Sequence, residues 1–144
     1  MTVLDANLLL YAYDADSPKQ RAVATWLTDL VDGGEPVGLP WLTIWAFLRI
    51  STNSRIWTSP LTVKRALGII KEWIAQPRVV VLNPGPRHAE ILERLVNKHG
   101  VTGALMTDAV LAGLAIENGA LLASTDQHFS RFSELRWVNP LDTE

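Results

Sequence analysis

The chain has 144 residues, of which 48% are hydrophobic and 19% are charged, so it predicts one folded domain over residues 1–144 and excludes a disordered segment. It contains no cysteine, which excludes disulfide scaffolds, thiol nucleophiles and cysteine-ligated zinc sites. The formal net charge of −2 argues against a uniformly basic nucleic-acid-binding surface, and the three histidines lack the close spacing of a zinc site.

Short apolar runs alternate with helical patterns, which predicts an α/β fold with a mostly parallel central sheet of four to five strands flanked by helices. The first half of the chain predicts a strand at residues 2–4, a helical turn at 6–13, a helix opened by Ser17 and Pro18 and ended by Gly33 and Gly34, a strand at 36–39 and a helix at 41–50. The second half predicts a loop at 51–60, a helix capped by Thr62 and running to Ala75, a strand at 78–82, a helix from Pro86 to Gly100, a helix capped by Thr107 and ending near Glu117, a strand at 121–124, a helical turn at 128–132 and an edge strand at 136–138.

The segment between residues 36 and 70 contains no acidic residue but four basic ones, so any contact with a polyanion is expected there. The first residues lack the basic segment of a signal peptide, and no apolar run is long enough to cross a bilayer. We therefore expect a cytoplasmic protein without a membrane partner.

Three aspartates stand where elements change. Asp5 follows the first predicted strand, Asp126 follows a late strand, and Asp108 lies in the first turn of a helix. Each of them on its own is also explained as a helix cap. If the two strands are neighbours, however, their carboxyl ends share one crevice, and three carboxylates without a cation repel one another. The pattern predicts a site for Mg²⁺ or Mn²⁺, which prefer oxygen ligands.

A divalent ion in such a site suits phosphate chemistry, because it activates water and clamps phosphate oxygens. A phosphatase of the haloacid dehalogenase type is an alternative, but it needs a second Asp where this chain has Asn7. It also needs a late lysine, and no lysine follows Lys98. The same lack of a late lysine argues against a phospho-receiver signalling domain.

Several motifs then resemble a known family. Leu4-Asp5-Ala6-Asn7 with the apolar residues that follow, Thr107-Asp108-Ala109, and Ser124-Thr125-Asp126 resemble the PIN domain, most closely the VapC-type toxins of bacterial toxin–antitoxin pairs. Segments 38–53 and 136–141 resemble a mycobacterial branch of these toxins. The resemblance covers essentially the whole chain. It implies a Mg²⁺-dependent endoribonuclease toxin that cleaves cellular RNA by attack of a metal-activated water on the phosphodiester, and that a cognate VapB-type antitoxin neutralises.

The resemblance assigns metal binding and catalysis to Asp5, Asp108 and Asp126, with Asn7 and Ser124 as supporting residues. One position departs from the family: many PIN domains carry a Glu in the helix after the second strand, and Ala46 stands there. We therefore expect one firmly held ion and a second that arrives with the substrate. The departure also keeps open a non-cleaving PIN-fold protein that binds RNA or a partner.

Contacts with RNA and partners depend on the middle of the chain. Arg49 is a candidate for binding an RNA phosphate or for pairing with an Asp near the metal site. Arg55 is a candidate for contacting the RNA backbone, although a solvated surface position explains it better. Trp41 and Trp45 lie four residues apart on one predicted helix, which favours a place in the core or in a groove for a partner helix over stacking on RNA bases. The resemblance also implies a homodimer, and an antitoxin whose basic side chain enters the acidic crevice in place of the metal. His128 is the one histidine close to the predicted site.

Overall fold

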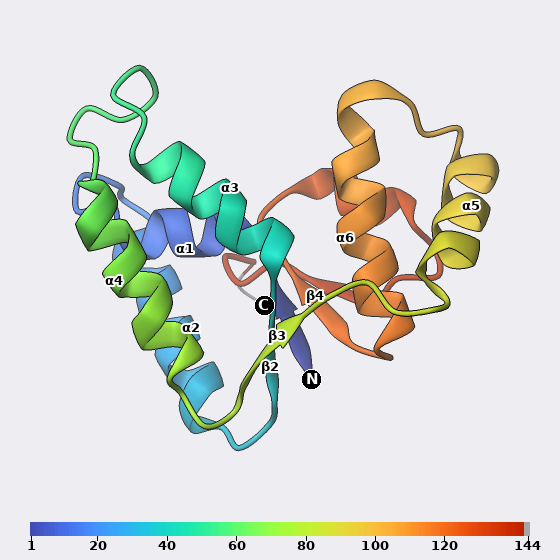
Figure 1. Cartoon of the computed structure of the whole chain (residues 1–144), viewed down its shortest axis with the longest axis horizontal. Helices are drawn as coiled ribbons and strands as arrows, with labels where there is room; N and C mark the ends of the chain where they lie inside the picture. The colour runs from blue at the N-terminus through green and yellow to red at the C-terminus, as the bar shows by residue number, and fades with distance from the viewer. Residues whose placement is uncertain (143–144) are drawn as a thin grey trace.

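The computed structural model describes residues 1–142 of the chain. Five strands form one sheet in the order β3-β2-β1-β4-β5, and every pair of neighbours is parallel (Figure 1). The strands are β1 (Thr2–Leu4), β2 (Val37–Pro40), β3 (Val79–Leu82), β4 (Leu121–Ala123) and β5 (Trp137–Val138). The predicted α/β fold with a parallel sheet is therefore confirmed, with β1 at its centre.

The helices divide into two groups that lie on either side of the sheet (Figure 1). The first group contains α1 (Ala6–Ala12), α2 (Gln20–Asp32), α3 (Trp41–Ser51) and α4 (Val63–Ile74), and the second contains α5 (His88–His99) and α6 (Met106–Glu117). Parallel strands need such crossover helices, because each new strand must start from the same end of the sheet. Within residues 1–142, no helix combines the length and the apolar character needed to span a bilayer.

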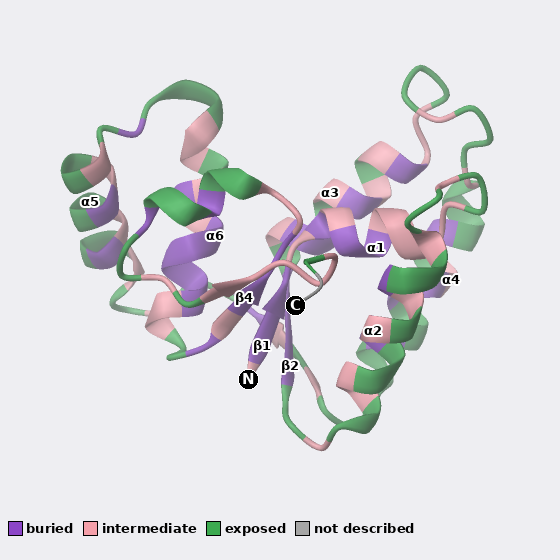
Figure 2. Ribbon diagram, turned by 180° about the vertical axis from the view of Figure 1, so that it is seen from behind, coloured by how far each residue is buried: buried purple, intermediate pink, exposed green. Residues whose placement is uncertain are grey.

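The core follows from the alternation of side chains along each strand. Leu4 and Ala123 join the cluster under α1–α4, whereas their neighbours Val3 and Leu122 join the cluster under α5 and α6. Successive strand residues point to opposite faces, so a strand buried on both sides must be apolar at every position. Figure 2 shows the central strands buried between the two helical layers.

Two predicted helix starts are wrong. Helix α2 begins at Gln20 and not at Ser17, because the Ser17 hydroxyl accepts a hydrogen bond from the Lys19 backbone N–H (3.2 Å) in a turn that precedes the helix. Helix α6 begins at Met106, and a short 3₁₀ segment, Gly103–Leu105, leads directly into it, so Thr107 lies inside the helix instead of capping it.

One predicted helix start and one predicted helix end are confirmed. The Thr62 hydroxyl accepts a hydrogen bond from the Arg65 backbone N–H (3.1 Å) and caps α4, as residues of this type do at helix starts. Gly100 ends α5 in the left-handed conformation with φ of 61°, which glycine adopts without steric cost.

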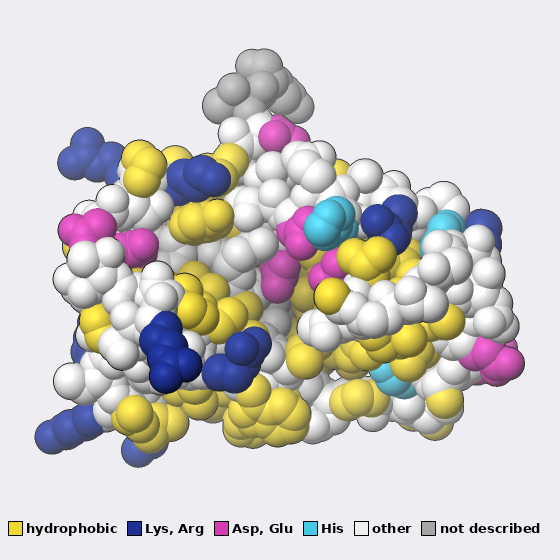
Figure 3. All heavy atoms as spheres, turned by 90° about the horizontal axis from the view of Figure 1, so that it is seen from above, with side chains coloured by type: hydrophobic (Ala, Val, Ile, Leu, Met, Phe, Trp, Pro, Cys, Tyr) yellow, Lys and Arg dark blue, Asp and Glu magenta, His cyan; other side chains and the backbone are white. Residues whose placement is uncertain are grey.

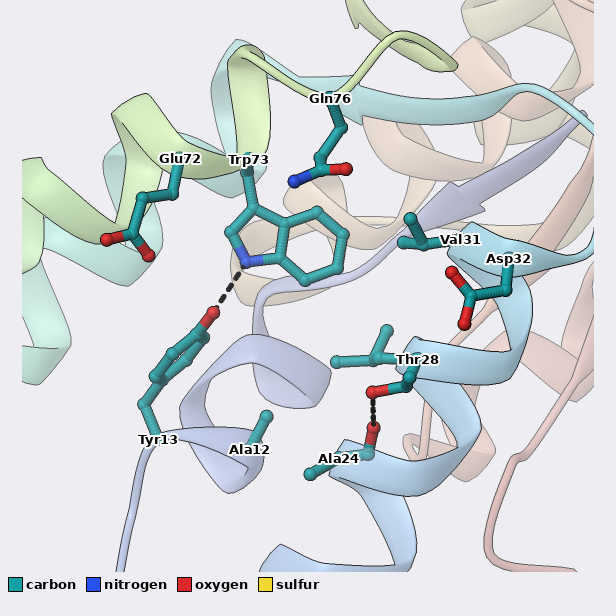
Figure 4. A pocket seen from close by; sticks show the side chains of 10 residues that line it. Ala12, Tyr13, Ala24, Thr28, Val31, Asp32, Glu72, Trp73 and Gln76 are labelled. Carbon is teal, nitrogen blue, oxygen red and sulfur yellow. Dashed lines mark hydrogen bonds between the residues drawn. The ribbon is translucent and has the colours of Figure 1, made fainter.

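The prediction of a core position is wrong for the tryptophans of α3. Trp41 and Trp45 are 37% and 61% exposed, because the inner face of the helix is formed by the buried Ile44 and Phe47. Trp73 of α4 is buried, and its indole N–H donates a hydrogen bond to the Tyr13 hydroxyl (2.9 Å; Figure 4). Both of these rings line a cavity of about 370 Å³ between α1, α2 and α4.

Candidate functional site

The sheet brings Asp5 and Asp126 to one edge. Leu4 pairs with Ala123 across β1 and β4, and the Asp5 backbone N–H donates to the Ala123 carbonyl oxygen (3.0 Å). Asp5 caps α1, with its Oδ1 accepting from the Ala6 N–H (2.7 Å). Asp126 caps a 3₁₀ segment, Gln127–Arg131, in the same way, accepting from the His128 N–H (2.9 Å). Both aspartates therefore follow strands, as the sequence predicted, and the pairing of β1 with β4 meets the condition that these strands be neighbours.

Ser124 connects the two aspartates. Its side chain is fully buried, and its hydroxyl donates to Asp5 Oδ2 (2.7 Å). The hydroxyl oxygen of Ser124 accepts from the Asn7 side-chain amide (3.1 Å) and from the Asp126 backbone N–H (3.0 Å). Its carbonyl oxygen accepts from the Trp137 indole (2.9 Å). The hydroxyl thus fixes the position of the Asp5 carboxylate and of the backbone that carries Asp126.

Asp108 approaches from the first turn of α6. His128 Nδ1 lies 3.8 Å from Asp108 Oδ2 and 3.2 Å from Asp126 Oδ1. One ligand atom from each of these three residues lies within 4.8 Å of those of the other two. Figure 3 shows acidic and histidine side chains gathered at the centre of this face, with basic side chains mainly on the side of α1–α4. The cluster offers two carboxylates and one imidazole, and Asp5 lies beside it.

The charges of this site repel one another. Burial raises the pKa of Asp5 from 3.8 to about 6, and hydrogen bonds from Ser124 and Ala6 only partly oppose this increase. The negative charges of Asp108 and Asp126 raise the pKa of Asp5 further. A carboxylate with an unfavourable ionised form is a place where a cation is stabilising.

The pKa of Asp108 is shifted by the same surroundings. Its pKa is raised by burial and by the charge of Asp126, whereas the positive charges of His128 and Arg131 lower it. The donor set of two carboxylates and one imidazole, with the Asp5 carboxylate beside it, fits a divalent cation, and the dominance of oxygen ligands favours Mg²⁺ or Mn²⁺.

The basic candidates lie on α3 and in the loop that follows it. Arg49 is exposed in the last turn of α3, and Arg55 is exposed in the loop that follows. Within residues 1–142 neither forms an ion pair with an acidic side chain at 4.0 Å or less, so the pairing considered for Arg49 is not present. Ala46 is partly buried on α3, a helix without any acidic residue.

Three residues contribute to the site without having been singled out from the sequence. Arg131 acts electrostatically on Asp108, and the Trp137 indole holds the Ser124 carbonyl. Thr43 of α3 donates its hydroxyl proton to the carbonyl oxygen of Leu4 (2.7 Å), which fixes the backbone just before Asp5. Only Arg131 had a visible signal, since it is a basic residue one turn after Asp126.

Comparisons with known proteins agree with this architecture. The model of the PIN domain matches residues 2–135. Ribonuclease VapC33 of Mycobacterium tuberculosis is 40% identical over 141 residues, which cover 98% of this chain and 99% of that protein. Ribonuclease VapC37 of the same species is 37% identical over 140 residues, covering 97% of each.

Solved structures share the fold at low sequence identity. A VapBC2 structure from Rickettsia felis, bound to a DNA fragment of its promoter, superposes with a TM-score of 0.71 at 15% identity, and the match covers 96% of this chain and 97% of that one. VapC20 of Mycobacterium tuberculosis, described as a toxin that cleaves the sarcin–ricin loop, gives 0.67 at 12% identity over 94% of this chain and 99% of that one. Together with the full-length sequence matches, these findings show that the chain belongs to the PIN-domain family, among the VapC ribonucleases.

Proposed function

We propose that this protein is a metal-dependent endoribonuclease toxin that hydrolyses phosphodiester bonds of cellular RNA. The observation that carries the proposal is the cluster of Asp108, Asp126 and His128, whose ligand atoms lie within 4.8 Å of one another. Asp5 lies beside it, because the Ser124 hydroxyl contacts both the Asp5 carboxylate and the Asp126 backbone N–H. The similarity to VapC ribonucleases, at 37–40% identity over nearly the whole chain, indicates RNA as the substrate class.

Asp5, Asp108 and Asp126 would hold Mg²⁺ or Mn²⁺. When bound, such an ion lowers the pKa of a water and offsets negative charge on phosphate oxygens. The chain contributes the rigidity of the site. The Ser124 hydroxyl holds Asp5 Oδ2 at 2.7 Å, and Asn7 holds the Ser124 oxygen at 3.1 Å, so the carboxylate needs little rearrangement.

His128 and Arg131 balance the charge of the site from its other side. The imidazole Nδ1 is 3.2 Å from Asp126 Oδ1 and 3.8 Å from Asp108 Oδ2. Arg131 opposes the rise in the pKa of Asp108 that burial and the charge of Asp126 cause. Residues 36–70 supply exposed basic side chains, Arg49 and Arg55 among them, for contacts with the RNA backbone.

The partner of such a toxin would be a small VapB-type antitoxin. Trp41 and Trp45 form an exposed aromatic pair, with ring centroids 6.0 Å apart, which suits an apolar segment of a partner. A basic side chain of the antitoxin in the acidic crevice would replace the charge of the metal. A complex structure in which no antitoxin residue contacts the crevice would refute this arrangement. We also propose a homodimer, and light scattering that detects only a monomer would contradict it.

Ala46 supports a second candidate, a PIN-fold protein that binds RNA or a partner without cleaving it. This residue replaces the Glu that the resemblance led us to expect, and α3 offers no other carboxylate. One fewer ligand weakens the binding of a second ion. A protein that contains its metal, shifts RNA in a gel and leaves it intact would favour this candidate.

The test is the incubation of total cellular RNA with purified, antitoxin-free protein. Discrete fragments are expected with Mg²⁺ or Mn²⁺, and they should disappear with a chelator or in the Asp5→Asn variant. Asp29→Asn is the matched control, because Asp29 is exposed on α2 and touches none of the site residues. Intact RNA under every condition, from folded protein that still binds a divalent ion, would refute the nuclease.

A further inference from the structure

A second cavity opens beside the acidic site. It has a volume of about 310 Å³ and is lined by residues of α1, of the turn after α1, of the last turn of α3 and of the loop that follows α3. Asn7 belongs to its lining and is also the residue whose amide holds the Ser124 hydroxyl (3.1 Å). Asn7 therefore connects the cavity to the residue that holds the Asp5 carboxylate.

The composition of the cavity suits a flat, heteroaromatic group. Tyr11 and Trp57 contribute two partly buried rings, and Ile56, which is 59% exposed, forms part of the lining. The Lys19 ammonium lies 4.9 Å from the centre of the Tyr11 ring, so one face of that ring is already covered. Aromatic side chains of this kind hold unpaired bases of RNA by stacking.

The loop that carries Trp57 has a defined shape. The Trp57 and Ile56 backbone N–H groups both donate to the Asn53 carbonyl oxygen (3.0 and 3.1 Å), and the Leu61 N–H donates to the Ser51 carbonyl oxygen (2.9 Å). The Asn53 side chain accepts from the Arg55 N–H (2.9 Å). These contacts fix the backbone that carries Trp57, which reduces the cost of ordering the loop on binding.

The polar groups of the cavity favour a base that donates hydrogen bonds. Asp14 and Asp16 both line it, and an ionised carboxylate only accepts hydrogen bonds. Guanine presents two adjacent donors, N1–H and the N2 amino group, on its Watson–Crick edge, whereas uracil presents one donor between two carbonyl acceptors. Carboxylates at this edge would attract guanine and repel uracil.

We propose that the cavity lined by Tyr11, Trp57, Asp14 and Asp16 is a base subsite that holds one unpaired guanine of the RNA next to the cleaved phosphate. The inference rests on the proposed function and extends it, because it assigns part of the sequence preference to named residues. The cavity volume of about 310 Å³ suits one base, since small-molecule sites begin at about 300 Å³.

The test follows the indole N–H signals of ¹⁵N-labelled protein in NMR spectra during titration with guanosine 5′-monophosphate or uridine 5′-monophosphate. Both nucleotides carry the same ribose and phosphate, so a difference between them reports the base. Trp57→Phe identifies the Trp57 signal, and Trp45, which is exposed on α3, is the internal control. The guanine nucleotide is expected to shift the Trp57 signal and to bind at least about fivefold more tightly than the uracil nucleotide.

The variant that isolates the carboxylate is Asp14→Asn. Its side-chain oxygen can still accept from the Asp16 backbone N–H, as Asp14 Oδ1 does at 3.1 Å, so the turn is preserved. The preference for guanine is expected to fall below twofold in this variant and to persist in Asp29→Asn. Equal shifts with both nucleotides, or a shift of Trp45 without Trp57, would overturn the proposal.

Mapping of the cleavage sites separates this inference from the nuclease itself. The wild type should cut RNA next to guanine, and Asp14→Asn should lose that preference. Cleavage of RNA without any nucleotide-induced shift at Trp57 would remove the subsite and leave the nuclease in place. A guanine-selective shift in a protein that cuts no RNA would keep the subsite and refute the nuclease.

Discussion

The Asp5 carboxylate is a local source of instability in the metal-free protein, and its replacement by Asn should stabilise the fold. Burial and the charges of Asp108 and Asp126 raise its pKa to about 6, although Ser124 and Ala6 hydrogen-bond to it. An amide of the same shape removes the charge and keeps an oxygen that can accept from the Ala6 N–H. Asp5→Asn is therefore expected to be more stable than the wild type at neutral pH in a chelator.

The size of the effect follows from the pKa. The difference between about 6 in the folded chain and the ordinary value of 3.8, at about 1.4 kcal/mol per pH unit, corresponds to about 3 kcal/mol. Because both carboxylate oxygens accept hydrogen bonds, the amide loses the bond from the Ser124 hydroxyl, which costs about 1 kcal/mol. The net gain is about 2 kcal/mol, or about 5 °C in the melting temperature of a chain of this length.

The pH dependence gives the prediction its sign. A raised carboxyl pKa means that the folded state binds the proton more tightly than the unfolded state. The wild type therefore loses stability as the pH rises from about 4 to about 6, and the loss is complete above that range. The advantage of Asp5→Asn should vanish near pH 4 and be fully present at pH 7.5.

Urea denaturation in a chelator measures the difference in the free energy of unfolding between the wild type and Asp5→Asn at pH 4 and at pH 7.5, with Asp29→Asn as the control. Addition of Mg²⁺ should then stabilise the wild type more than Asp5→Asn. An Asp5→Asn protein that is no more stable than the wild type at pH 7.5, or equally more stable at both pH values, would refute the electrostatic reasoning.

Three further predictions test the surroundings of the site. Ser124→Ala should lower the free energy of unfolding by about 2 kcal/mol in urea, because the buried hydroxyl makes three hydrogen bonds; a loss below about 0.5 kcal/mol would contradict its connecting role. His128→Ala should weaken Zn²⁺ binding about tenfold in calorimetry and leave Mg²⁺ binding nearly unchanged, since imidazole is a poor ligand for Mg²⁺; unchanged Zn²⁺ binding would show that the imidazole is not a ligand. Although partial burial opposes it, hydrogen bonds from Ser133 and His99 lower the pKa of Glu134 to about 2, so this side chain stabilises the fold above pH 4.5 and ceases to do so as the pH falls to about 2. Because Glu134 is exposed, Glu134→Gln should cost less than about 1 kcal/mol at pH 7, and a larger loss in urea would show a stronger network than this.

The sequence was informative about the edge of the sheet because strand ends are visible in it. Asp5 and Asp126 follow apolar runs, and parallel strands place such residues at one edge whichever neighbours they have. It was less informative about Ser124, whose hydroxyl donates a hydrogen bond to Asp5, 119 positions away in the chain. A contact of this kind depends on the register of β1 and β4, which periodicity does not give.

The errors have local causes. Thr107 resembles a helix cap in the sequence, but the 3₁₀ segment Gly103–Leu105 leads directly into α6, so the helix begins one residue before Thr107. A core position of Trp41 and Trp45 was expected beside the alternative of a partner groove, because large apolar residues four positions apart usually share a buried face; only the core position is wrong. In α3 the buried face was taken by Ile44 and Phe47, so the tryptophans remained exposed.

The central claim is that Asp5, Asp108 and Asp126 hold a divalent ion that is needed to cut RNA. The most direct measurement is the initial rate of cleavage of one RNA fragment by the wild type and by the three Asp→Asn variants, with Mg²⁺, with a chelator, and after Mg²⁺ is restored. We predict cleavage that stops with the chelator, resumes with Mg²⁺ and falls at least about a hundredfold in each variant, while Asp29→Asn keeps the wild-type rate. Cleavage that persists in the chelator, or variants that cut at the wild-type rate, would contradict the account.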